Sequence, residues 1–178
     1  MFIIAQIIGV LAIVVFAISP HQKSKVKVLV FEILSSIFFA LQYFLLGAYS
    51  GTATSIITII NNLIFAKYAK DEKKIPFYWL AIYIIVNILA GIFTYTNIFS
   101  FFPVVISILY AYGVWQDNLK VNRFIILFGA LAWMIYNLAV SAYSTSIGNL
   151  YEIISAAIAI WRLDIYKNKK EITNLKKE

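Results

Sequence analysis

Long apolar runs dominate the chain, and short polar segments separate them. Seven runs are long enough to cross about 30 Å of hydrocarbon as helices. They are Phe2 to Ser19, Val26 to Gly47, Thr52 to Tyr68, Phe77 to Tyr95, Ile98 to Trp115, Phe124 to Ala142 and Ile147 to Leu163. The separators, such as KDEKKIP and QDNLK, hold turn-forming and charged residues. Because a backbone in lipid must satisfy its hydrogen bonds within the span, the pattern predicts seven transmembrane helices.

The basic residues follow a simple rule along this pattern. All fifteen lysines and arginines lie in or beside the separators after the first, third and fifth runs, or at the end of the seventh run and beyond it, and the other separators have none. Basic residues of short loops stay on the cytoplasmic side of a membrane. The N-terminus is therefore predicted outside and the C-terminus in the cytoplasm. A missed or invented span would break this alternation.

An internal repeat is visible when the chain is shifted by 94 residues. The shift lays the first three runs on the last three without a gap, and it aligns AYS at 48–50 with AYS at 142–144. The fourth run is then an unpaired connector. We predict an all-α membrane protein in which two parallel three-helix repeats flank a linker helix, with a binding site between them. The predicted single domain, 1–178, comprises repeat one 1–70, linker helix 75–96, repeat two 97–165 and a basic cytoplasmic tail 166–178.

Composition excludes several classes of function. The chain is 62% hydrophobic and 13% charged, whereas a soluble domain is about 25% charged. The net charge of +7 is explained by the loops and by contact with anionic lipid, so no nucleic-acid partner is predicted. With one histidine and no cysteine, no disulfide or metal site is expected. No phosphate-binding loop or paired nucleophile and base is evident, so we predict neither an enzyme nor a cofactor.

Glu152 is the most informative polar residue within the runs. A charge near mid-membrane costs roughly 2.5–3.5 kcal/mol, so this carboxylate should face the protein interior or water. Arg162 lies ten residues further on, about 15 Å along a helix, which is too far for a direct pair. We therefore expect Asn61, Asn62 or Asn137 to be its partner from across the bundle.

Other polar side chains form two stripes that the 94-residue shift superimposes. Each stripe has a spacing of three, which places its members on one helix face. The stripes are Ser55, Thr58 and Asn61, and Asn149, Glu152 and Ser155. Gln42 is predicted to lie at about the same depth in the membrane as Glu152 and Asn137. Trp133, which the shift aligns with Phe39, is predicted to form a wall of a binding cavity.

Each of these residues also has a purely structural interpretation. Asparagine, glutamine and serine often join packed helices in membranes, with bonds worth about 0.6 kcal/mol on average. Glu32 is close enough to the cytoplasmic end of its run to snorkel or to meet Lys25 and Lys27, so we assign it a structural role. Glu152 is the better functional candidate because packing seldom needs a carboxylate.

Three segments resemble a known family. The sequences ISPHQKSK and LQYFLLGAYSG and the asparagine pair at 61–62 are similar to bacterial inner-membrane proteins of the YgjV type, over essentially the whole chain. That family in turn resembles the SWEET and PQ-loop transporters, which have three plus one plus three helices. The resemblance implies an inner-membrane location, and hinges at Pro20 with Gln22 and at Gln116, where the second hinge lacks the proline. It also implies substrate contacts at Asn61 and at Asn149 or Glu152.

The resulting hypothesis is a transporter that moves a small polar metabolite, such as a sugar, amino acid or vitamin, by alternating access. The predicted substrate-binding residues are Glu152, Asn149, Asn61, Asn62, Gln42 and Asn137, with Trp133 and Phe39 as walls. If Glu152 titrates during the cycle, transport is coupled to protons. The alternative is a membrane scaffold or receptor whose polar residues only pack helices. The lipid bilayer is the predicted partner, and the sequence is also compatible with a homo-oligomer.

Overall fold

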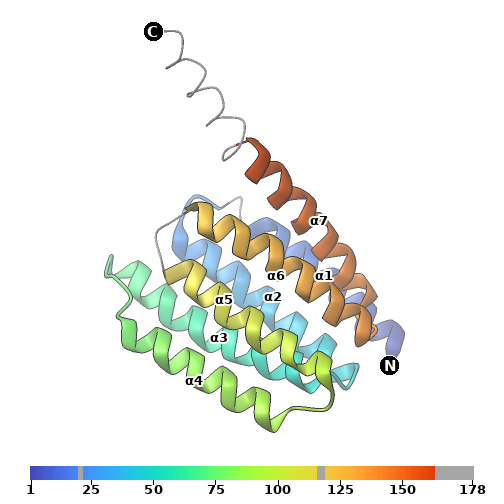
Figure 1. Cartoon of the computed structure of the whole chain (residues 1–178). Helices are drawn as coiled ribbons and strands as arrows, with labels where there is room; N and C mark the ends of the chain where they lie inside the picture. The colour runs from blue at the N-terminus through green and yellow to red at the C-terminus, as the bar shows by residue number, and fades with distance from the viewer. Residues whose placement is uncertain (20–21, 116–118, 163–178) are drawn as a thin grey trace, which may run out of the picture.

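The computed structural model describes residues 1–19, 22–115 and 119–162, and these form seven α-helices and one short 3-10 helix (Figure 1). In order they are α1 (Phe2–Ile18), α2 (Lys25–Leu45), α3 (Tyr49–Lys70), α4 (Phe77–Phe93), η2 (Ile98–Ser100), α5 (Phe101–Trp115), α6 (Leu119–Ala139) and α7 (Tyr143–Ile160). Each α-helix corresponds to one predicted span, so the prediction of seven helices is confirmed for the described part of the chain. The predicted tail, 166–178, lies outside the described residues.

Three helices begin at least three residues earlier than the apolar runs predicted: α6, at Leu119 instead of Phe124, and the two that follow the matched short turns, α3 and α7. Helix α3 starts at Tyr49 instead of Thr52, and α7 starts at Tyr143 instead of Ile147. Their first turns are rich in serine and threonine, which a hydropathy criterion leaves out. Neither start has a side-chain cap of its own. Side chains from other helices bond there instead, and a local pattern does not reveal such contacts.

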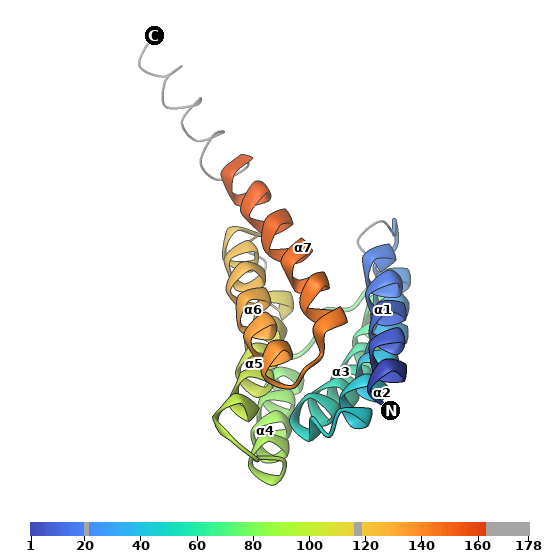
Figure 2. The ribbon, with the colours of Figure 1, turned by 90° about the vertical axis from the view of Figure 1, so that its right-hand side faces the viewer.

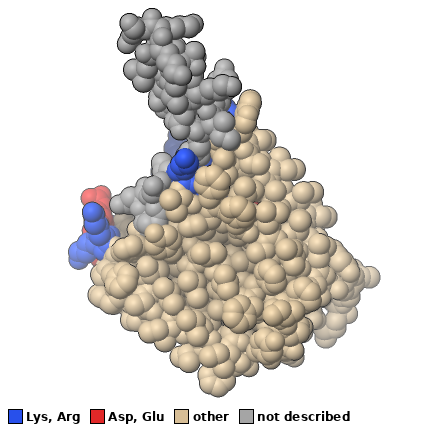
Figure 3. Space-filling view, in the orientation of Figure 1, with Lys and Arg blue, Asp and Glu red and all other residues tan. Residues whose placement is uncertain are grey.

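Polar and apolar side chains are distributed as expected for a surface in lipid. Two helices of the described chain, Lys25–Leu45 and Lys120–Ala139, have both the length and the apolar composition to cross a bilayer, and α1 and α4 are apolar but shorter. Large apolar side chains are exposed along the helices, whereas the buried side chains include as many polar as apolar ones. On the face in Figure 3, the blue and red side chains gather at one end, here called the charged end, and the tan surface has no lysine, arginine, aspartate or glutamate. This inversion of the soluble pattern supports a membrane environment.

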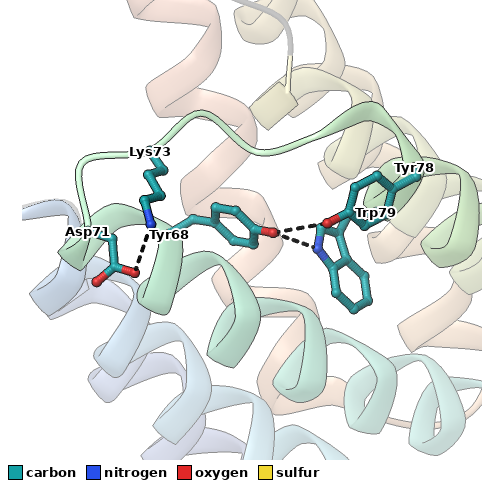
Figure 4. A network of polar contacts seen from close by, with 5 residues as sticks. All are labelled: Tyr68, Asp71, Lys73, Tyr78 and Trp79. Carbon is teal, nitrogen blue, oxygen red and sulfur yellow. Dashed lines mark hydrogen bonds and ion pairs between the residues drawn. The ribbon is translucent and has the colours of Figure 1, made fainter.

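Aromatic side chains close the turn between α3 and α4 at the charged end (Figure 4). The Trp79 Nε1–H donates to the Tyr68 hydroxyl at 3.0 Å, and this hydroxyl lies 3.2 Å from that of Tyr78. Lys73 Nζ is 4.0 Å from an Asp71 oxygen, and both side chains are largely exposed, so their pairing adds little stability. Tyrosine and tryptophan at such a position fit the belt that marks a membrane–water interface.

The helices pack in a regular order. Helix α2 lies between α1 and α3, and α6 lies between α5 and α7. Figure 2 shows α1, α2 and α3 on one side and α5, α6 and α7 on the other. Contacts between α1 and α7 and between α3 and α5 join the two groups, and α4 packs on both α3 and α5.

The turns after α2 and α6 share one backbone geometry. Both helices have 21 residues, and their ends lie 94 residues apart. Gly47 has φ 71° and Ser141 has φ 60°, at equivalent places in the two turns. The next residue closes each turn: Ala48 N–H donates to Tyr43 O at 2.8 Å, and Ala142 N–H donates to Asn137 O at 2.7 Å. The 94-residue shift therefore relates backbone structure as well as sequence over these turns.

This matched pair of turns yields a stability prediction. A residue other than glycine with positive φ costs about 1 kcal/mol, and a Cβ at Gly47 would meet nothing within 4 Å. We therefore expect Gly47→Ala to lower the unfolding free energy by about 1 kcal/mol. We expect Ser141→Gly to raise it by a similar or smaller amount, because glycine also gains freedom in the unfolded chain. Thermal unfolding of the purified protein in detergent measures both changes, and shifts of the same sign would contradict the argument.

Candidate functional site

Gln42 joins α2 to the start of α7. Its side chain is fully buried; Nε2 donates to Ser144 Oγ at 3.0 Å, and Thr145 Oγ1 donates to Gln42 Oε1 at 2.5 Å. Gly9 on α1 makes room for this contact, because a Cβ there would collide with the Gln42 amide and the Ser144 hydroxyl. The structure thus places Gln42, a predicted substrate ligand, in contact with two side chains of the protein.

Tyr136 makes the equivalent contact from α6 to the start of α3. It lies 94 residues after Gln42, and its hydroxyl is 3.1 Å from Ser50 Oγ and accepts from the Gly51 N–H at 2.9 Å. Ser50 and Gly51 are in turn the residues 94 before Ser144 and Thr145. We call these two sets the Gln42 and Tyr136 contacts. Both lie at the end opposite the charged end, where α3 and α7 begin.

Side chains from α6 and α1 also cap the starts of α3 and α7. The first N–H groups of a helix have no partner within it. In α3 the Gly51 N–H donates to the Tyr136 hydroxyl. In α7 the Ser144 N–H donates to Gln6 Oε1 at 2.9 Å, while Gln6 Nε2 donates to Ser141 O at 2.7 Å. The helix starts that the sequence misplaced are therefore stabilised from α1 and α6.

A chain of four side chains leads from α2 to Glu152. The Tyr43 hydroxyl donates to Asn137 Oδ1 at 2.8 Å, and Asn137 Nδ2 donates to Asn149 Oδ1 at 2.7 Å. Asn149 Nδ2 then donates to Glu152 Oε2 at 3.3 Å. We call this the Glu152 chain. It brings together three of the predicted site residues, Glu152, Asn149 and Asn137, from α6 and α7.

The prediction that Asn61, Asn62 or Asn137 is the direct partner of Glu152 was wrong. Its direct partner is Asn149, three residues earlier on the same helix face, with Asn137 one step further away. Asn62 instead donates to Glu32 Oε2 at 3.2 Å. The reason is depth: Asn62 lies about 20 Å from the start of α3, and Glu152 lies about 14 Å from the start of α7.

Glu32 belongs to a second polar contact, separate from the Glu152 chain. It lies on α2 near the charged end and is partly buried. Its carboxylate accepts from Asn62, and its backbone carbonyl accepts from Ser35 Oγ at 2.9 Å. Sequence analysis expected snorkelling or a lysine partner here, and the amide of Asn62 is what the structure shows. Asn61 is partly buried on the same turn of α3.

Aromatic rings line the same level as the Glu152 chain. Tyr43 stacks on Trp133 with centroids 6.0 Å apart and on Phe39 with centroids 6.4 Å apart. Trp133 also meets Tyr136 edge to face at 5.7 Å. The predicted walls, Phe39 and Trp133, are thus brought together, and Tyr43 between them was not anticipated.

Tyr110 on α5 is a candidate that sequence analysis missed. Among the described residues its buried hydroxyl has no hydrogen-bond partner. Its ring lies over Gly129 of α6, where a Cβ would be only 2.6 Å from the ring. The Glu152 carboxylate acts electrostatically on the hydroxyls of both Tyr43 and Tyr110. The glycine opposite the tyrosine is the one sequence signal, and it is visible only once α5 and α6 are known to pack.

The remaining predicted residues lie away from this level. Ser155 continues the stripe of α7 but is exposed. The exposed Gln22 Nε2 donates to Ile18 O at 3.2 Å, and the other hinge residues, Pro20 and Gln116, lie outside the described residues. Within the described ranges, no three histidine, cysteine, aspartate or glutamate side chains group together as metal ligands.

Comparison with known proteins identifies the family. A family model described as bacterial inner membrane protein, Imp-YgjV, matches residues 3–167. The chain belongs to this family. Membership agrees with the exposed apolar surface and confirms the resemblance to YgjV-type proteins. No curated protein and no solved structure matches the chain, so the likeness to SWEET and PQ-loop transporters stays a prediction.

The hydroxyls of Tyr136 and Tyr110 provide a matched test of the contacts between helices. Tyr136→Phe leaves the buried Gly51 N–H and Ser50 hydroxyl without their partner, so we expect a loss of about 1–3 kcal/mol in unfolding free energy. Tyr110→Phe removes a buried hydroxyl without a partner in the described chain, so we expect no loss or a small gain. Thermal unfolding in detergent measures both.

Both substitutions remove one oxygen and keep the ring, so each controls for the packing of the other. Equal destabilisation by the two variants would mean that the space left by the missing oxygen, and not the loss of the Tyr136 hydrogen bonds, accounts for the change in stability.

Proposed function

We propose that this family member is a transporter that moves a small polar metabolite by alternating access. The observation that carries the proposal is the Glu152 chain, a hydrogen-bonded path that is buried from Tyr43 to Asn149 and ends on the partly buried Glu152 carboxylate, at the level where the two helix groups meet. In a membrane protein such a carboxylate is costly and most often marks a functional pathway.

The proposed architecture is α1–α3 and α5–α7 as parallel repeats, with α4 as the linker helix. The matched turns and the equal lengths of α2 and α6 support it. So do the Gln42 and Tyr136 contacts, which the 94-residue shift exchanges. The contact of α1 with α7 becomes that of α5 with α3 under the same shift. Binding between parallel repeats is the common arrangement in transporters of this type.

The basic residues set the proposed orientation. The charged end, which holds Lys67, Lys70, Lys73 and Lys74, faces the cytoplasm, and the opposite end faces outward. The Gln42 and Tyr136 contacts then close the outer side of the site. Opening to the outside requires these hydrogen bonds to separate and to be replaced by water. The hinges proposed for this movement are Pro20, Gln22 and Gln116.

Within the proposed site, Glu152, Asn149 and Asn137 would hydrogen-bond the substrate, and Trp133 and Phe39 would contact its apolar parts. Gln42, Asn61 and Asn62 would serve at other stages of the passage, because Gln42 lies nearer the end where α3 and α7 begin, and Asn61 and Asn62 lie further toward the charged end than Glu152 does. Protonation of Glu152 during the cycle would couple transport to protons.

A second candidate function is a non-transporting scaffold or receptor. The complete burial of Gln42 and Asn137, each bonded to other side chains of the protein, favours it, because packing alone would produce such contacts. The two functions differ in whether water reaches Glu152.

Thiol labelling tests the proposal in this cysteine-free chain. We expect Glu152→Cys to react with a small polar, membrane-impermeant thiol reagent added on either side of the membrane, because alternating access exposes the site to both. Ile154→Cys is the matched control: it lies two residues further on and is 51% exposed on the apolar surface, so we expect lipid to shield it. Labelling is measured by mass shift in cells and in inverted vesicles.

Each pattern of labelling has a defined meaning. Reaction of Glu152→Cys from both sides with an unreactive Ile154→Cys supports the transporter. If neither variant reacts, the site is sealed and the scaffold replaces the transporter. Equal reaction of both would mean that the reagent reaches the lipid-facing surface, and a bulkier charged reagent would then be used.

A further inference from the structure

The charge of the site limits the chemistry of what it can bind. Glu152 is the ionisable group at the end of its chain, and in the described structure an amide, Asn149, is its partner instead of a lysine or arginine. The nearest basic residue along α7 is Arg162, about 15 Å away. Among the described residues, no lysine or arginine forms an ion pair with Glu152.

Hydrogen-bonding groups around Glu152 are directed in a way that leaves its second oxygen available. Asn149 uses Nδ2 for Glu152 Oε2 and Oδ1 for Asn137, and Asn137 uses Oδ1 for the Tyr43 hydroxyl. The amides are thus held in one orientation by their own contacts. While Glu152 is ionised, it can bind a ligand that donates hydrogen bonds without disturbing this order, but it cannot bind one that only accepts.

Tyr110 supplies an independent observation. A buried hydroxyl without a partner is unusual and calls for an explanation such as a ligand. This hydroxyl interacts electrostatically with the Glu152 carboxylate but forms no hydrogen bond within the described residues. It approaches from α5, whereas the carboxylate comes from α7. A ligand bonded to both would fill a position that the protein leaves unsatisfied.

The aromatic rings beside the chain favour the same chemistry. Tyr43 is stacked between Phe39 and Trp133, and Tyr43 is itself hydrogen-bonded into the Glu152 chain. Faces of aromatic rings attract cations. Both faces of Tyr43 are covered by its two neighbours, so the outer faces of Phe39 and Trp133 are the ones this stack leaves for an ammonium group.

We infer that the solute carried by this site is a small organic cation with a protonated amine, which binds between Glu152 and the Tyr110 hydroxyl beside the Phe39, Tyr43 and Trp133 rings. This inference rests on the proposed transporter function and specifies its substrate class. The inference assigns the binding of the cation to Glu152 and not to Glu32, which lies on α2 only five residues from Lys27.

Three probes of nearly equal size test the charge requirement. Ethanolamine, ethylene glycol and glycolate share one hydroxyl end and differ in the other, which is an ammonium, a hydroxyl or a carboxylate group. Each is added to the purified full chain in detergent at neutral pH, with sodium chloride at matched ionic strength as the control. Thermal unfolding is followed as the concentration rises.

We expect ethanolamine to raise the Tm of the wild type by a few degrees for each tenfold increase above its Kd, and the other additions to leave Tm unchanged. Glu152→Gln should abolish the shift, and Glu32→Gln should keep it. Tyr110→Phe should fold normally but need a severalfold higher concentration for the same shift. If Glu152→Gln does not fold, the Tyr110→Phe comparison still tests the site.

Other results overturn the inference in distinct ways. Equal shifts with ethylene glycol would mean that charge is not recognised, and equal shifts with sodium would assign the site to a metal cation. No shift with any probe, or a shift retained in both Glu152→Gln and Tyr110→Phe, would also reject it. The thiol labelling of Glu152→Cys separates these failures from failure of the transporter, because a site open from both sides without an ethanolamine shift would leave a carrier with another substrate class.

Discussion

Polar groups buried in a membrane protein must find partners within the protein, and this constraint organises the whole bundle. Water is absent from the hydrocarbon region, so an unpaired N–H or carbonyl costs several kcal/mol. In this chain the first turns of α3 and α7 have no caps of their own. Tyr136 and Gln6 supply partners from α6 and α1. Helix starts and contacts between helices are thus satisfied by the same hydrogen bonds.

Small residues are what allow these polar contacts to form. A Cβ on Gly51 would stand 2.8 Å from the Tyr136 hydroxyl, and one on Gly9 would occupy the space of the Gln42 amide. Close approach of backbones through glycine and alanine is the usual means of packing helices in lipid, where apolar burial gives no net drive. The sequence therefore uses glycine to bring polar side chains within hydrogen-bonding distance, not only to pack helices.

Hydropathy predicted the number and order of helices because the separators are short and charged in alternation. It could not predict the starts of α3 and α7, since these depend on side chains from other parts of the chain. The stripe on α7 correctly related Asn149 to Glu152, because a spacing of three is a local property. The contact of Asn62 with Glu32, and the unpaired hydroxyl of Tyr110, depend on which helices are neighbours and on their relative depth. Those facts are absent from any single run of sequence.

The same contacts that hold the two helix groups together must be weak enough to separate if the site is to open on both sides. Hydrogen bonds between helices in membranes are worth about 0.6 kcal/mol on average, because competing partners are available in the opened state. The Gln42 and Tyr136 contacts end on hydroxyls and on one helix terminus, and water can replace each of these. A bundle joined at this level by interlocked apolar side chains would instead have to expose them to water. Joining the groups through polar contacts at the end opposite the charged end therefore permits both a closed state and an open one, at a modest difference in free energy.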